Sequence, residues 1–103
     1  MATTTVTFGK IAKDFPAIIS SSFVSETLTP TSSNQQTTVV APTDALKDGN
    51  IVANVATDTQ IYVAFGSNPN ALTSTGARKM IPAGGDAYFV VNGGDECAVT
   101  LAP

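Results

Sequence analysis

The chain has 103 residues, a net charge of −3 and 13% charged residues, against roughly 25% in a typical soluble domain. This length allows one domain with one modest core. The five cations are scattered, which excludes the continuous basic surface that follows a nucleic-acid backbone. They are Lys10, Lys13, Lys47, Arg78 and Lys79. We therefore expect no nucleic-acid partner.

The chain also lacks the signals of export and membrane insertion. It begins MATTTVTFGK, without a cationic segment followed by an apolar stretch, so we expect no secretory signal and synthesis in a bacterial cytoplasm. No run approaches the roughly 18 apolar residues of a membrane span. Cys97 is the single cysteine, which excludes an intrachain disulfide, and its position in CAVTL predicts a buried small apolar side chain.

The N-terminal third combines one clear strand with a segment that is harder to assign. TTTVTFG (3–9) alternates apolar residues with threonines and predicts a half-buried strand. In the segment 9–26, apolar residues at approximately helical spacing surround Pro16, which disfavours a continuous helix. We expect an extended or broken segment that contacts this core or another subunit. The polar residues 27–36 predict an exposed, mobile loop.

Short strands with turns between them account for the middle of the chain. TTVVAP (37–42) predicts a strand, and TDALKDG (43–49) allows at most one helical turn. NIVANVA (50–56) places Ile51, Ala53 and Val55 on one face. TDT (57–59) then has the length of a hairpin connection.

Three further strands are predicted between residues 60 and 101. QIYVAFG (60–66), AYFVV (87–91) and CAVTL (97–101) are separated by residues typical of turns. The first two are apolar on both faces, which predicts that both faces are covered by a second sheet, by loops or by a neighbouring subunit. Because charged residues are few, the excess apolar surface indicates assembly into a homo-oligomer.

Together these elements predict an all-β fold. We expect a small β-sandwich or jelly-roll-like barrel of about six to eight short antiparallel strands, with an extended N-terminal segment. Residues 1–36 would form the N-terminal strand, arm and polar loop, which we expect to contact partners. Residues 37–103 would form the sandwich core of what is a single domain overall.

The residues that usually carry chemistry are scarce. Histidine is absent, which excludes Ser-His-Asp and Cys-His arrangements and removes the commonest metal ligand. Asp86, Asp95 and Glu96 lie near glycines that could present carbonyl oxygens to calcium, but turn formation explains the aspartates better. Glu26 or Glu96 could pair with an aspartate for glycoside hydrolysis, although the chain has no tryptophan and little mass to enclose a substrate. We expect no catalytic residue, no cofactor and no metal.

Two further motifs have structural explanations. The sequences GGD (84–86) and NGGD (92–95) match no nucleotide-binding pattern and predict turns. The pair Arg78-Lys79 is expected to solubilise a loop.

Residues 52–99 resemble the small β-rich virion proteins of tailed bacteriophages, most of all capsid decoration (cementing) proteins. The resemblance is carried by the xVAxGxNPxA pattern at 62–71, the xPAG step at 81–84, the aromatic residues Tyr88 and Phe89, and the Gly-Asp turn before the last strand. It implies a non-enzymatic viral structural protein on the capsid surface of a virion, which binds the major capsid protein and copies of itself and stabilises the capsid.

The N-terminal segment is the expected place of partner contact. Its apolar residues Phe15, Ile18, Ile19 and Phe23 could reach the major capsid protein or a sister subunit. One alternative is a neck or tail structural or completion protein of the virion. Another is a carbohydrate-binding β-sandwich module, for which Tyr62, Tyr88, Phe65 and Phe89 would be the aromatic candidates. Their positions within strands predict that these four are core residues first.

Overall fold

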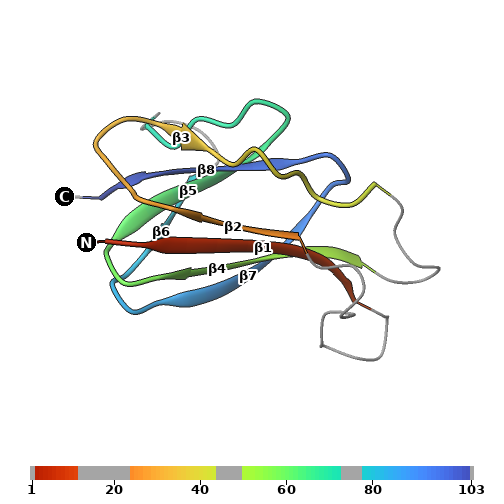
Figure 1. Ribbon diagram of the computed structural model, residues 1–103, viewed down its shortest axis with the longest axis horizontal. Coiled ribbons are helices and arrows are strands. Elements are labelled where there is room, and N and C mark those ends of the chain that lie inside the picture. Colours follow the sequence, from red (N-terminus) through yellow and green to blue (C-terminus); the bar gives the residue numbers. More distant parts are fainter. Residues whose placement is uncertain (1, 12–23, 44–49, 73–77, 103) are drawn as a thin grey trace.

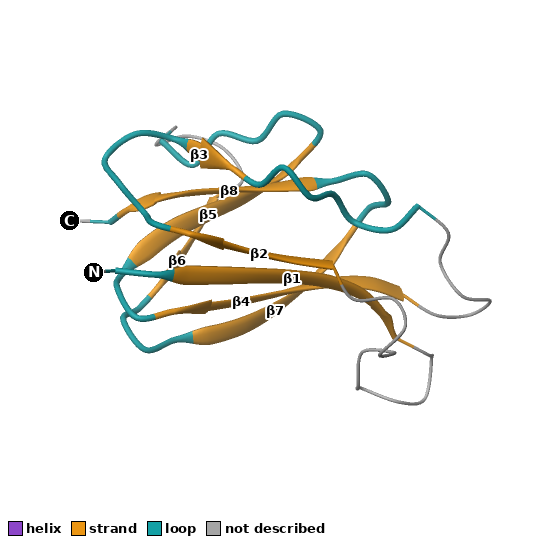
Figure 2. Ribbon diagram, in the orientation of Figure 1, coloured by secondary structure: helices purple, strands orange, loops and turns teal. Residues whose placement is uncertain are grey.

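Two four-stranded antiparallel sheets face each other across one apolar core in the computed structural model (Figures 1 and 2). The structure describes residues 2–11, 24–43, 50–72 and 78–102, and these contain strands and loops but no helix. The strands are β1 (Thr4–Ile11), β2 (Val24–Leu28), β3 (Gln35–Gln36), β4 (Asn50–Thr57), β5 (Ile61–Gly66), β6 (Arg78–Ile81), β7 (Asp86–Val91) and β8 (Glu96–Leu101). The predicted all-β sandwich is confirmed.

The strand pairing is nested. The first sheet has the order β2-β1-β4-β7, and the second has the order β3-β8-β5-β6. Consequently β5 pairs with β6, β4 with β7 and β3 with β8, so the chain from β3 to β8 is one long hairpin folded over two sheets. The result is a small antiparallel β-sandwich. The N-terminal strand β1 completes it by lying between β2 and β4.

The core is formed by side chains that alternate along the strands of both sheets. On β1, Val6 and Phe8 are fully buried, and they pack with Val55 of β4. From the second sheet, Ile61 and Val63 of β5 contribute side chains that are at most 1% exposed. The predicted inward face of residues 50–56 is confirmed, because a strand with a period of two places every second residue in the core. Since β1 supplies two of the fully buried residues, the sandwich includes the N-terminal strand.

The outer face of the second sheet is covered by the chain itself. Ala71, in the loop after β5, is fully buried against Ala64 of β5 and Ala98 of β8. Asn34 fixes this loop, because its side-chain oxygen accepts a hydrogen bond from the Ala71 N–H at 2.8 Å and its amide group donates to the Pro69 carbonyl at 3.1 Å. The prediction that both faces of 60–66 are covered is thus confirmed, and a loop supplies the second cover.

Glycines make the two predicted turns possible. Gly84 and Gly94 have φ angles of 76° and 85°, a left-handed conformation that other residues rarely adopt. Gly93 is needed for a different reason, because a Cβ atom there would lie 2.8 Å from the Cα of Thr43. The turn interpretation of GGD and NGGD is confirmed.

Residues 27–42 differ from the prediction. The expected loop contains the end of β2, all of β3 and the buried Pro30, and the expected strand at 37–42 is absent. Thr37 and Ala41 keep backbone hydrogen bonds to Cys97 and Asp95, but side chains interrupt the pairing between them. The carboxylate of Glu26 accepts hydrogen bonds from the N–H groups of Thr38 and Val39, and the Thr37 hydroxyl donates to the Val39 carbonyl. Such local hydrogen bonds compete with a regular ladder.

Three more predictions concern the Arg78-Lys79 pair, the helical turn at 43–49 and the apolar residues of the N-terminal segment. Arg78 and Lys79 belong to β6 rather than to a loop, because they pair with Ala64 and Val63 of β5. Most of the single helical turn predicted for 43–49 lies outside the described residues, and so do Phe15, Ile18, Ile19 and Phe23.

Candidate contact surface

The outer face of the first sheet carries the most exposed apolar side chains of the described residues. In β7, the alternation directs Phe89 and Val91 to the core, and it directs Asp86, Tyr88 and Val90 outward. Tyr88 is 64% exposed and Val90 is 71% exposed. Because β7 is the edge strand of its sheet, these side chains lie where a partner could reach them from the side as well as from above.

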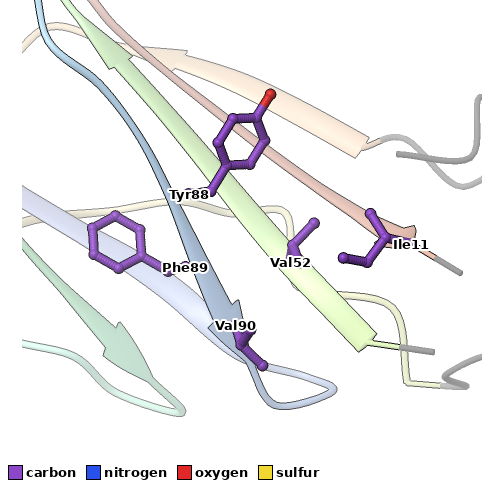
Figure 3. A pocket seen from close by; sticks show the side chains of 5 residues that line it. All are labelled: Ile11, Val52, Tyr88, Phe89 and Val90. Carbon is purple, nitrogen blue, oxygen red and sulfur yellow. The ribbon is translucent and has the colours of Figure 1, made fainter. Parts of the chain in front are cut away.

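A shallow hollow of about 400 Å³ lies beside these two side chains, lined by Ile11, Val52, Tyr88, Phe89 and Val90. Figure 3 shows Ile11, Val52 and Tyr88 on three successive strands, β1, β4 and β7. The sheet register places Val52 directly between Gly9 of β1 and Val90 of β7. Val52 is only 4% exposed, so it forms the floor of the hollow, while the exposed apolar area comes mainly from Tyr88 and Val90.

Polar groups border this apolar surface on the other side. The next row of the register contains Thr7, Asn54 and Tyr88. The side-chain amide of Asn54 donates a hydrogen bond to the carboxylate of Asp86, which ties β4 to the beginning of β7. Among the described residues that line the hollow, no side chain is charged. Its chemistry is therefore that of an apolar contact, with the Tyr88 hydroxyl as a polar group at the rim.

A second hollow, of about 340 Å³, lies on the outer face of the second sheet and is lined by Ser32, Tyr62, Leu72, Arg78, Thr100 and Leu101. Arg78 closes part of it, because its guanidinium carbon lies 3.7 Å from the centre of the Tyr62 ring. The same guanidinium donates a hydrogen bond to the Ala71 carbonyl at 3.2 Å. These contacts hold the loop after β5 against the sheet, which gives Arg78 a structural role.

The four aromatic residues considered for carbohydrate binding do not form a platform. Phe65 and Phe89 pack together against the core, with ring centres 5.0 Å apart. Tyr62 is half-buried under Arg78. Tyr88 is exposed, so the prediction that it belongs to the core is wrong, because its side chain lies on the face of the first sheet that points away from the second sheet.

The groups considered for chemistry have structural partners. Cys97 is fully buried, and burial raises the pKa of its thiol to about 12, so it is neither nucleophilic nor available to a metal near neutral pH. Asp95 accepts a hydrogen bond from the Asn92 N–H at 3.0 Å within its turn, and Asp86 is bound by Asn54. Across the described ranges, no three acidic or cysteine side chains gather as metal ligands.

The residues expected to contact partners, Phe15, Ile18, Ile19 and Phe23, fall in a range that the structure does not describe. The surface formed by Ile11, Val52, Tyr88 and Val90 was not among the predicted contact residues. Its signal in the sequence is the pair of apolar faces in AYFVV. That pattern predicted a covered strand and left open what covers it.

No helix long and apolar enough to cross a membrane occurs in the part of the chain that is described. No family model, curated protein or solved structure matches this chain. The resemblance of residues 52–99 to phage virion proteins therefore stays a prediction from the sequence.

Proposed function

We propose that this chain is a non-enzymatic structural protein that decorates a phage capsid and stabilises it by binding the major capsid protein. The observation that carries the proposal is the apolar surface that the described residues Ile11, Val52, Tyr88 and Val90 form on the outer face of the first sheet. A binding surface of this kind provides contact area without requiring catalytic groups. The sequence resemblance supplies the class of partner.

The mode of stabilisation follows from mass action. A protein that binds the assembled shell and not its separated subunits stabilises the shell by an amount that grows with its free concentration. The stability of the shell then depends on the fraction of its binding sites that are occupied. The decorating protein needs only a face that is complementary to the shell. The low charge of the chain agrees with this mode of binding, because binding through an apolar surface is driven by apolar burial more than by electrostatic attraction.

Particles assembled without this protein test the proposal. They should rupture at lower temperature or under milder osmotic shock, and adding the purified chain should restore their resistance. Equal robustness of decorated and undecorated particles would contradict the cementing function. The copy number per particle separates two locations: hundreds of copies indicate decoration, whereas about six or twelve indicate a ring at the neck or tail.

A point substitution then tests the surface. Tyr88→Lys should reduce particle binding at least about tenfold, because it replaces an exposed aromatic contact with a charge. Ala83→Lys is the matched control, since Ala83 is exposed in the turn between β6 and β7. Binding that is lost equally in both variants, or in neither, would assign the capsid contact to another part of the molecule.

A further inference from the structure

The backbone of β7 leaves a free hydrogen-bonding edge. The Thr57 N–H donates to the carbonyl of Gly85 at 3.1 Å, one position beyond the last register pair of β4 and β7, Ala56 and Asp86. In an antiparallel pair, hydrogen-bonded and non-hydrogen-bonded positions alternate. Phe89 therefore bonds to β4, while the N–H and C=O groups of Tyr88 and Val90 point away from the sheet. No group among the described residues pairs with them.

The pairing on the opposite side of β4 confirms this alternation. Asp58, the residue after β4, donates its N–H to the Thr3 carbonyl. Counting back along β4 from Asp58, every second residue therefore directs its backbone groups to β1. Val52 and Asn54 belong to that set. The residues between them, including Ala53, consequently face β7, and Ala53 is the register partner of Phe89.

Of the four edge strands in the two sheets, β7 is the longest and the least protected. Proteins usually guard edges with short strands, charges, prolines or covering loops. The edge strand β3 has only two residues, β6 carries Arg78 and Lys79, and β2 is tied by Glu26 to the loop after β3. β7 has a single charge, Asp86, at its first position. Its remaining residues read AYFVV, without charge or proline.

We propose that β7 is a self-association edge, at which the β7 strands of two copies of this chain pair antiparallel across a two-fold axis. A two-fold axis makes the interface self-complementary, so one edge serves both copies. In the register that brings complementary side chains together, the two-fold axis passes beside Phe89 of both copies. This register places Tyr88 opposite Val90 of the second copy, and Val90 opposite Tyr88 of the second copy, as two aromatic to β-branched pairs. Asp86 then lies opposite Asn92 and meets no like charge.

The size of this interface makes the dimer reversible. A tyrosine side chain buries about 150 to 250 Å² when it is fully covered. Two copies of the exposed parts of Tyr88 and Val90, together with the strand edges, reach at most the lower end of specific interfaces, at about 1,200 Å². We therefore expect a dimer that forms with rising concentration, with main-chain hydrogen bonds as its specific component.

The dimer joins two four-stranded sheets into one continuous sheet. The hollows lined by Ile11, Val52, Tyr88 and Val90 then lie on the same outer face, related by the two-fold axis. The apolar surface that stays exposed beside the new strand pair then comes from both copies. The self-association edge does not depend on the proposed function, because it is formed by the purified chain alone.

Hydrogen exchange of the unmodified chain tests the pairing directly. The amides of Tyr88 and Val90 should exchange at least about tenfold more slowly at high protein concentration than at low concentration, while the Phe89 amide, already bonded to β4, should not change. Sedimentation over the same concentrations should show a shift from monomer to dimer. A chain that stays monomeric up to about 1 mM, or a dimer without protection of these two amides, would overturn the proposal.

Val90→Pro supplies the second test. Proline removes the outward N–H and is tolerated on an edge strand when that N–H faces solvent. The variant should raise the dimer dissociation constant at least about tenfold, whereas Val90→Thr, which keeps the N–H, should dimerise like the parent. An unchanged dissociation constant in a folded Val90→Pro variant would exclude this edge. If capsid binding fails but the dimer forms, only the proposed function is wrong.

Discussion

The guanidinium carbon of Arg78 lies 3.7 Å from the centre of the Tyr62 ring, so a cation on β6 is stacked on an aromatic residue of β5. The same side chain reaches the Ala71 carbonyl. Ala71 in turn covers Ala64 and Ala98 on the outer face of the second sheet. One arginine thus links the edge strand, its neighbour and the loop that covers both.

Replacement of this arginine should destabilise the sandwich. We expect Arg78→Ala to lower the free energy of unfolding by about 1 kcal/mol, because it removes a partly exposed cation–π contact and a hydrogen bond to a carbonyl. Urea unfolding followed by tyrosine fluorescence measures this. Lys79→Ala, at the exposed neighbouring position, should stay within about 0.5 kcal/mol of the parent. Equal effects in the two variants would contradict a specific role for Arg78.

Phe8 should be among the most sensitive positions of the chain. It is fully buried and lies on β1, between β2 and β4. Phe8→Ala should cost about 3 to 5 kcal/mol, because it removes the largest fully buried side chain of the described residues and leaves a cavity. Thr7→Ala, on the opposite face of the same strand, should cost about 0.5 kcal/mol or less. A small effect at Phe8 in denaturant unfolding would show that β1 is not part of the cooperative core.

Glu26 should contribute stability that depends on pH. Burial alone would raise the pKa of its carboxyl group, but hydrogen bonds from the Val39 N–H, the Thr38 N–H and the Thr38 hydroxyl outweigh this and lower the pKa below its ordinary value of 4.5. Because the folded state favours the ionised form, this stability is present above pH 4.5 and is lost as the pH falls through the lowered pKa.

The substitution Glu26→Gln isolates that contribution. It should cost about 0.5 to 1 kcal/mol at pH 7, a modest amount because the site is partly solvated, and the difference from the parent should shrink below pH 4. Unfolding in urea at several pH values measures it. Glu96→Gln on β8 is the control, since the Glu96 carboxylate accepts no hydrogen bond from the described residues. A difference at Glu26 that is independent of pH would contradict this account.

Cys97 should make the protein less stable in alkali. Burial raises the pKa of its thiol from 9.0 to about 12, so between these values the unfolded chain loses a proton that the folded chain keeps. Stability must then fall as the pH rises through this range, by about 1 kcal/mol at pH 10 relative to pH 8. Cys97→Ala should lack this part of the slope. Thiol-specific reagents should label the folded parent slowly at pH 8 and rapidly in urea, and rapid labelling without urea would contradict the burial.

The strands with strong alternation could be predicted from the sequence because burial decides their faces. Val6 and Phe8 on β1 and Ile51, Ala53 and Val55 on β4 are spaced by two, and the structure places them in the core. The short strands β3 and β6 could not be predicted in this way. Gln35 and Gln36 have no apolar periodicity, and their strand exists only because β8 lies beside them.

The absent strand at 37–42 and the contact surface illustrate two other limits. The sequence TTVVAP has good strand propensity, but Glu26, more than ten residues earlier, binds the N–H groups of Thr38 and Val39, and local propensity contains no information on that contact. For Tyr88, alternation alone could not tell that one apolar face of β7 has no cover. The packing of the two sheets decides this, because the second sheet covers only the face of β7 that carries Phe89 and Val91.

Both ends of the sequence are attached to the same turn. The Thr3 carbonyl accepts a hydrogen bond from the Asp58 N–H, and the Ala102 N–H donates to the Gln60 carbonyl. The eight residues of β1 separate this turn from Ile11, at the far end of the hollow, by about 25 Å at the rise of an extended strand. Any polypeptide joined at either end, such as a fluorescent label or a displayed antigen, would therefore leave from the pole opposite the contact surface, with its own access to solvent.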